Sequence, residues 1–323
     1  MWALPSLAKS HLEKVDYDMY RRWKTYRKVY IWTFNWFTSY VPWGGLGAMG
    51  CDPVNLERCH TWINQDPAQA TLRMWPVIQE LGHNLGLAHS ARLVTWPLPD
   101  GTPAFALHEY GDRVCPMGSG EAEDQDNYII CTNAAQSYKA GWSRPIPGGH
   151  LNAFADLKLS VHQEFRLPPM HSTKYNMLRI SVDPAYSIID DSDINFQLAV
   201  FVSYRVRQSG VGTFDSGIQT RLDRRVWIQE YNHRANGRPS YMDHWTHNMA
   251  VLTDERPLPL FDDGFGYLNR SWTKMFPGGV PGGITITMRS KTDAAAIVTV
   301  CRFLAPTEWG GGTTCMDGQD NDW

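Results

Sequence analysis

Alternating apolar and polar positions characterise the second half of this 323-residue chain. The clearest case is residues 196–206, where every second residue is apolar. That period of two is typical of a strand with one buried face, and several such strands separated by turns predict a β-sandwich. Further strands are predicted at residues 226–228, 284–288 and 297–300. We therefore expect a mostly β, sandwich-like domain at residues 150–303, followed by a flexible tail at 304–323.

The first half of the chain follows a different pattern. Apolar residues spaced among Lys, Glu and Arg predict an amphipathic helix over residues 3–26. Residues 29–34 are β-branched and aromatic, which predicts a buried strand. Several prolines and a glycine predict a loop over residues 90–110, and residues 131–142 predict a short helix. The Pro-Ile-Pro-Gly-Gly cluster at 145–149 predicts a domain boundary.

A helix predicted from Pro76 to Gly86 has an apolar arc and a polar arc. Proline is favoured in the first turn of a helix, and glycine ends a helix at no steric cost. At about 100° per residue, four apolar residues share one arc and are expected to face the core. These residues are Val77, Ile78, Leu81 and Leu85.

The polar arc of this helix carries residues with metal-binding chemistry. Gln79 and His83 lie four residues apart, so both can reach one ion. The turn at Gly86 is expected to bring His89 back toward the same point. A catalytic zinc needs three protein ligands and an open position for water, which these three residues supply. Glu80 follows the first ligand and can serve as the general base.

Glu80, His83, Gly86 and His89 together agree with the H-E-x-x-H-x-x-G-x-x-H signature, from which only Gln79 departs. Chance agreement at these positions is improbable; an amphipathic helix with surface histidines is the alternative. The chain resembles metzincin metalloproteases, and more closely the gametolysin family of algal cell-wall lytic endopeptidases. The resemblance is carried by the Gln-Glu-x-x-His form and by four further segments. These are residues 43–51, 84–87, 110–118 and 131–142.

The resemblance implies an α+β, metzincin-like catalytic domain at residues 1–145 that is N-terminally short. Met117 would be the Met-turn, a methionine below the metal site that is not itself a ligand. An extended substrate would add as a strand along an edge formed by five residues. These are Gly45, Leu46, Gly47, Ala48 and Met49. Tyr110 and Tyr128 are the candidates for stabilising an oxyanion.

The implied cofactor is zinc. Gln79 offers a neutral amide oxygen in place of an imidazole nitrogen, which is a poorer partner for zinc. Copper stays open as an alternative, because Cu²⁺ binds most ligand sets more tightly than Zn²⁺ does.

Six cysteines fall into three pairs of near neighbours and predict disulfides in an oxidising compartment. Among the 15 connectivities that six cysteines allow, proximity favours Cys51–Cys59, Cys115–Cys131 and Cys301–Cys315. We expect a secreted, extracellular protein, although residues 1–10 contain no signal-peptide pattern. No apolar run is long enough to span a membrane. A net charge of −3 gives no reason to expect nucleic acid as a partner.

These observations predict a zinc-dependent endopeptidase acting on extracellular-matrix or cell-wall glycoproteins. Two alternatives stay open. One is a catalytically inactive, metzincin-like binding or adhesion protein that has lost metal affinity through Gln79. The other is a metal-dependent hydrolase of a bond other than the peptide bond.

Overall fold

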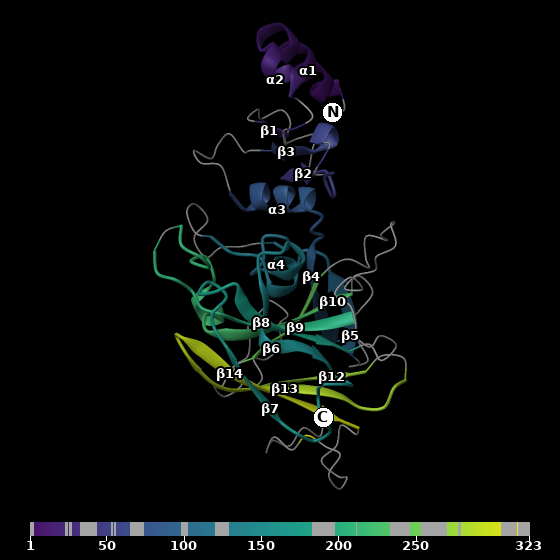
Figure 1. Ribbon diagram of the computed structural model, residues 1–323, viewed down its shortest axis with the longest axis vertical. Coiled ribbons are helices and arrows are strands. Elements are labelled where there is room, and N and C mark those ends of the chain that lie inside the picture. Colours follow the sequence, from purple (N-terminus) through teal and green to yellow (C-terminus); the bar gives the residue numbers. More distant parts are fainter. Residues whose placement is uncertain are drawn as a thin grey trace. The chain divides into compact units, whose positions relative to one another are not determined.

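The computed structural model has a mixed α+β fold that consists mostly of strands (Figure 1). It describes residues 3–22, 25, 28–32, 44–52, 54, 56–64, 74–97, 103–119, 129–182, 198–210, 212–232, 246–252, 270–276, 279–304 and 315. The chain divides into two compact units, Met1–Ala88 and His89–Trp323. None of the helices in this described part of the chain is long and apolar enough to cross a membrane.

The first unit contains a small sheet with strand order β1-β3-β2. β1 (Lys28–Trp32) runs parallel to β3 (His60–Asn64), and β2 (Gly45–Gly47) pairs antiparallel with the other side of β3. A 3₁₀ helix, η3 (Leu56–Arg58), precedes β3, and α3 (Met74–Asn84) follows it. The strand predicted at residues 29–34 is confirmed by β1, and residues 33–34 lie outside the described part. The prediction that this strand is buried is wrong, because Val29 and Ile31 are 43% and 48% exposed.

The helix predicted over residues 3–26 is two helices, α1 (Ala3–Val15) and α2 (Tyr17–Arg21). Asp16 interrupts them: its φ of −148° is not helical, and its side chain accepts a hydrogen bond from the backbone N–H of Met19. This is the usual N-cap role of aspartate.

The second unit contains a seven-stranded and a four-stranded sheet (Figure 1). The larger sheet has the order β5-β4-β11-β10-β9-β8-β6 and the smaller one β12-β13-β14-β7. The strands of the larger sheet are β4 (Ser90–Pro97), β5 (Pro103–His108), β6 (Arg144–Asn152), β8 (Tyr175–Ser181), β9 (Leu198–Arg205), β10 (Arg225–Asn232) and β11 (Thr246–Leu252). Those of the smaller sheet are β7 (Gln163–Leu167), β12 (Ser271–Met275), β13 (Gly283–Thr292) and β14 (Ala295–Phe303). A 3₁₀ helix, η5 (Thr220–Leu222), precedes β10.

One apolar core joins the two sheets. Val200 and Val202 of β9 belong to the same buried cluster as Ile286 of β13 and Val298 of β14. The opposite face of the larger sheet is covered by α4 (Ala134–Lys139), the short helix predicted within residues 131–142. Alternation along the strands therefore places apolar side chains on both faces of the larger sheet.

The strands predicted at 196–206, 226–228, 284–288 and 297–300 are confirmed within the described residues by β9, β10, β13 and β14. The loop predicted over residues 90–110 is wrong, because β4 and β5 form an antiparallel pair there. Pro97 and Pro103 face each other at the end of this pair, where a missing N–H costs little.

The expected boundary at residues 145–149 lies inside β6, whose pairing with β8 shifts register on both sides of Pro145. The breaker residues therefore produce an irregular strand rather than a linker. The assignment of domains to 1–145 and 150–303 stays a prediction, and the tail from 304 lies outside the described residues except for Leu304 and Cys315.

A buried ion pair between Arg205 and Asp215 holds the loop segments at Val114 and Cys131. Arg205 and Asp215 are 0% and 1% exposed, and the Arg205 Nε donates to Asp215 Oδ2 at 2.9 Å. Arg205 also donates to the carbonyls of Val114 and Cys131, while Asp215 accepts from the Cys131 N–H. The pair thus fixes two loop segments that are distant in sequence.

The predicted disulfide between Cys115 and Cys131 is wrong, since both thiols are free. Burial raises the pKa of each to about 12, so they stay protonated. Hydrogen bonds to Arg205 and Asp215 hold the backbone beside them, independently of any covalent link. The other predicted pairs, Cys51–Cys59 and Cys301–Cys315, are disulfides.

We predict that Asp215→Asn lowers the free energy of unfolding by about 3–5 kcal/mol, because it leaves the buried Arg205 charge uncompensated. Asparagine tolerates the left-handed φ of +59° at this position, so the substitution isolates the charge. Urea denaturation provides the measurement. The matched control is Asp293→Asn, which removes an exposed partner of Arg224; equal effects of the two substitutions would contradict the prediction.

Candidate active site

Helix α3 buries its polar arc rather than its apolar one. Gln79, Glu80 and His83 are 4%, 6% and 8% exposed, whereas Leu85 is 42% exposed. The prediction that Leu85 faces the core is therefore wrong, and Val77, Ile78 and Leu81 are only half-buried. The helix begins at Met74 rather than Pro76, which places proline within the first turn, where backbone N–H groups have no helical acceptor.

Glu80 lies against two glycines of β2. A Cβ at Gly45 would lie 2.6 Å from the Glu80 Cγ, and one at Gly47 would lie 2.4 Å from the Glu80 backbone oxygen. Burial raises the pKa of Glu80 to about 7, and the hydrogen bond from the Gly47 N–H acts in the opposite direction. A carboxyl group with this pKa can accept and return a proton near neutral pH.

The C-terminus of α3 is closed by a Schellman turn. The Gly86 N–H donates to the His83 carbonyl at 2.8 Å and the Leu87 N–H to the Gly82 carbonyl at 3.0 Å. Gly86 has a φ of +80°, which confirms the predicted helix end. The same turn orients the His83 ring, because its Nδ1 lies 2.8 Å from the Leu87 carbonyl. A carbonyl oxygen only accepts, so Nδ1 carries the proton and the lone pair is on Nε2.

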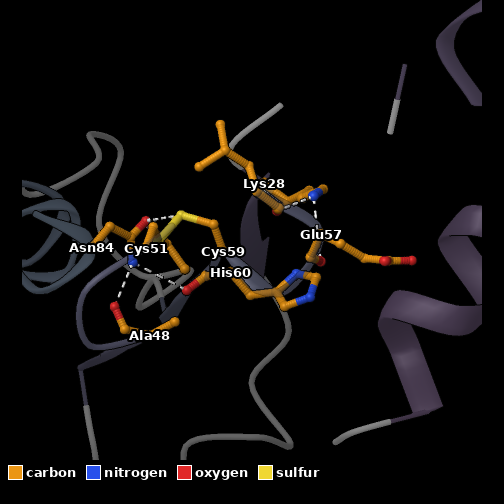
Figure 2. Close-up of a disulfide and its surroundings, with 9 residues drawn as sticks. Lys28, Ala48, Cys51, Glu57, Cys59, His60 and Asn84 are labelled. Carbon is orange, nitrogen blue, oxygen red and sulfur yellow. Dashed lines mark hydrogen bonds between the residues drawn. A yellow bond between two sulfur atoms is a disulfide. The ribbon is translucent and has the colours of Figure 1, made fainter. Parts of the chain in front are cut away.

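Asn84 ties the end of α3 to the sheet (Figure 2). Its side-chain nitrogen donates to the Ala48 carbonyl at 3.0 Å, and its oxygen accepts from the Thr61 hydroxyl at 3.0 Å. The Asn84 carbonyl accepts from the Cys51 N–H at 2.7 Å, beside the Cys51–Cys59 disulfide. The Cys59 sulfur also lies 3.3 Å from the Asn84 side-chain oxygen, but a disulfide sulfur has no proton to donate.

In the second unit, His89 is held from two sides. Its Nδ1 lies 2.5 Å from Glu109 Oε1, and its ring centroid lies 4.3 Å from that of Tyr110. An ionised carboxylate only accepts, so Nδ1 is again protonated and Nε2 carries the lone pair. Burial lowers the pKa of His89, which favours the neutral form, although Glu109 opposes this.

Met117 is fully buried and lies in a tight turn. This turn is hydrogen-bonded to Ser90, the residue after His89. The Met117 carbonyl accepts from the Ser90 N–H at 2.7 Å. A Cβ at Gly118 would lie 2.1 Å from the Asp112 backbone oxygen, so the turn requires glycine there. Asp112 Oδ2 in turn accepts from Ser90 Oγ and from Asn133 Nδ2, at 2.8 and 3.1 Å.

The structure thus places Gln79, Glu80 and His83 on one buried arc of α3 in the first unit, and His89 and Met117 in the second unit. Among the residues described, no three His, Cys, Asp or Glu side chains gather as a metal-binding group. Gln79 does not count toward such a group, because it is none of these four residue types. Of the predicted edge segment, Gly45, Leu46 and Gly47 form β2 at one edge of the sheet order, with Ala48 and Met49 directly after it. Tyr128 lies outside the described residues.

The environments of both histidines fit a metal. Imidazole ligands in metal sites donate one ring N–H to a carbonyl or carboxylate and bind the ion through the other nitrogen. His83 and His89 each meet the first condition, through Leu87 and Glu109. Sequence reasoning missed Glu109, and it gave Asn84, Asp112 and Asn133 no role beyond the similar segments that contain them.

Comparison with known proteins shows the family of the chain. The model of the family Gametolysin peptidase M11 matches residues 21–257, more than half of the chain, and the chain belongs to this family. The chain is also 26% identical over 300 residues to the autolysin of Chlamydomonas reinhardtii. This match covers 87% of the chain and 41% of autolysin, so the chain spans less than half the length of that relative. No solved structure matches the chain.

We predict that Gly47→Ala lowers the free energy of unfolding by about 1–3 kcal/mol. The new methyl group would clash with the Glu80 backbone oxygen, which cannot change rotamer to relieve the clash as a side chain can. Gly45→Ala should cost less, since it meets only the Glu80 side chain. Gly44→Ala is the control, because nothing lies within 4 Å of its Cβ position. Urea unfolding of the three variants checks the order; a Gly44 variant as unstable as the Gly47 variant would refute it.

Proposed function

We propose that the chain is a zinc metalloendopeptidase with a metzincin-type catalytic region. The observation that carries this proposal is the shared state of His83 and His89: each ring has its Nδ1 proton engaged by an acceptor, which makes Nε2 the ligand nitrogen. Gln79 supplies the third ligand atom, its side-chain oxygen. The spacing of these residues in a gametolysin-family chain supports their acting on one ion.

In this proposal Glu80 is the general base. Bound zinc would lower the pKa of a water molecule and polarise the scissile carbonyl. Glu80 takes the proton of the attacking water and passes it to the leaving amine. Its position between α3 and β2 supports this role, because the Gly47 N–H and the absence of side chains at Gly45 and Gly47 fix the carboxylate. Met117 supports the His89 segment from below through the Ser90 backbone.

The proposed substrate is a protein of the extracellular matrix or cell wall, bound as an extended strand along β2. The edge position of β2 supports this, and so do Leu46 and Met49, which are 42% and 46% exposed. The name of the Chlamydomonas relative, autolysin, is consistent with a cell-wall substrate. The two disulfides support an extracellular location. We assign catalysis to residues 1–145 and substrate recognition to the β-rich region at 150–303.

We predict that Glu80→Ala lowers kcat for cleavage of gelatin or a cell-wall glycoprotein by about 10²–10⁴-fold, because the general base is lost. Zinc content, measured by atomic emission, should stay at the wild-type level, since Glu80 is not a ligand. Full activity in this variant would exclude the mechanism.

We further predict that 1,10-phenanthroline abolishes cleavage and that added Zn²⁺ restores it. Parallel reconstitution with Cu²⁺ tests the metal, and we expect the zinc form to be the active one. Cleavage that persists in metal-free protein would contradict the proposal. A purified protein that neither binds metal nor cleaves any peptide would instead be an inactive binding protein.

A further inference from the structure

We propose that Glu109 is a positioning residue for His89: its carboxylate fixes the ring and the tautomer that presents Nε2 to the metal. This inference rests on the proposed metallopeptidase function for its consequence, but its geometry belongs to the second unit alone. Glu109 is not part of the H-E-x-x-H-x-x-G-x-x-H signature, and it lies 20 residues from His89 in sequence.

The pairing of β4 with β5 brings the two residues together. Arg92 faces His108 in this antiparallel pair, so the residues after β5 lie beside those before β4. The turn that follows β5 is closed by the Gly111 N–H, which donates to the His108 carbonyl at 2.9 Å. The Asp112 N–H then donates to the Ser90 carbonyl at 3.2 Å, which ties this turn to the residue next to His89.

The contact also differs from an ordinary surface ion pair. The His89 side chain is 17% exposed and that of Glu109 is 40% exposed, so the histidine end of the pair is the buried one. The hydrogen bond to Glu109 restrains the rotation of the His89 ring. The Tyr110 ring contacts the same ring at an interplanar angle of 45°, so the His89 ring has a second restraint. An exposed pair would lack both restraints and would contribute little.

The two proposed histidine ligands have different partners. His83 donates to a backbone carbonyl, whereas His89 donates to a side chain that can carry a full negative charge. A carboxylate partner makes an imidazole a stronger electron donor to a metal. This matters here because Gln79 contributes only a neutral amide oxygen. Glu109 thus offsets the weaker donor at position 79.

The first test is the dissociation constant for Zn²⁺, measured by competition with a chromophoric chelator. Glu109→Ala should weaken binding by about 10–100-fold, the range found when such partners are removed. Glu109→Gln keeps an acceptor oxygen without the charge and should fall between Glu109→Ala and wild type. Glu164→Gln, at an exposed position of β7, is the control and should match wild type. Equal affinity of wild type and Glu109→Ala would overturn the proposal.

The second test needs no metal. Long-range ¹H–¹⁵N NMR of the metal-free protein reports which ring nitrogen carries the proton, with the His89 signals assigned through a His89→Gln variant. We expect the Nδ1–H tautomer in wild type and a shift toward Nε2–H in Glu109→Ala. Unchanged His89 signals would overturn the inference even if zinc binds. If wild type binds no zinc while the tautomer shifts as expected, the proposed function fails and the positioning role stands.

Discussion

The packing of α3 on β2 is the constraint on which the candidate site depends. An unpaired carboxylate is costly to bury, so Glu80 can occupy the interface only where a donor meets it and no side chain competes for the space. Gly45 and Gly47 supply both conditions, since they leave the room and the Gly47 backbone supplies the N–H. This arrangement explains why α3 turns its polar arc inward and leaves Leu85 exposed.

Both histidines obtain their orientation from a turn. For His83 it is the Schellman turn at Gly86, which ends the helix and places the Leu87 carbonyl against Nδ1. For His89 it is the turn after β5, which places Glu109 against Nδ1. For His83 the acceptor is a backbone carbonyl, which the turn holds without any rotamer entropy. For His89 the acceptor is the side chain of Glu109, and the turn positions only its backbone.

Local sequence patterns predicted several elements of the fold. The strands β9, β10, β13 and β14 follow from alternation, and the end of α3 follows from Gly86, because both signals lie within a few residues. The strands β4 and β5 could not be predicted, because their prolines indicated a loop. The two strands pair with each other, and β4 also pairs with β11, more than a hundred residues away in sequence. The Cys115–Cys131 prediction failed for a similar reason. Sequence proximity gives no sign of Arg205 and Asp215, which hold those segments instead.

The residues of the candidate site likewise divide into those predicted from local spacing and one that depends on strand pairing. Gln79, Glu80, His83 and His89 could be read from their spacing, whereas Glu109 could not, because its contact with His89 depends on the register of β4 and β5.

In the proposed metal site, Gln79 and Glu109 would together determine how tightly the metal is held. A neutral amide oxygen in place of an imidazole weakens the ligand set, and a fourth protein ligand would restore the affinity. A fourth ligand would also occupy the position that a catalytic site reserves for water. A carboxylate hydrogen-bonded to the outer nitrogen of His89 adds negative charge without adding a ligand. In the proposed metallopeptidase, the charged partner of His89 would compensate for the weaker donor at position 79 and leave the water position open.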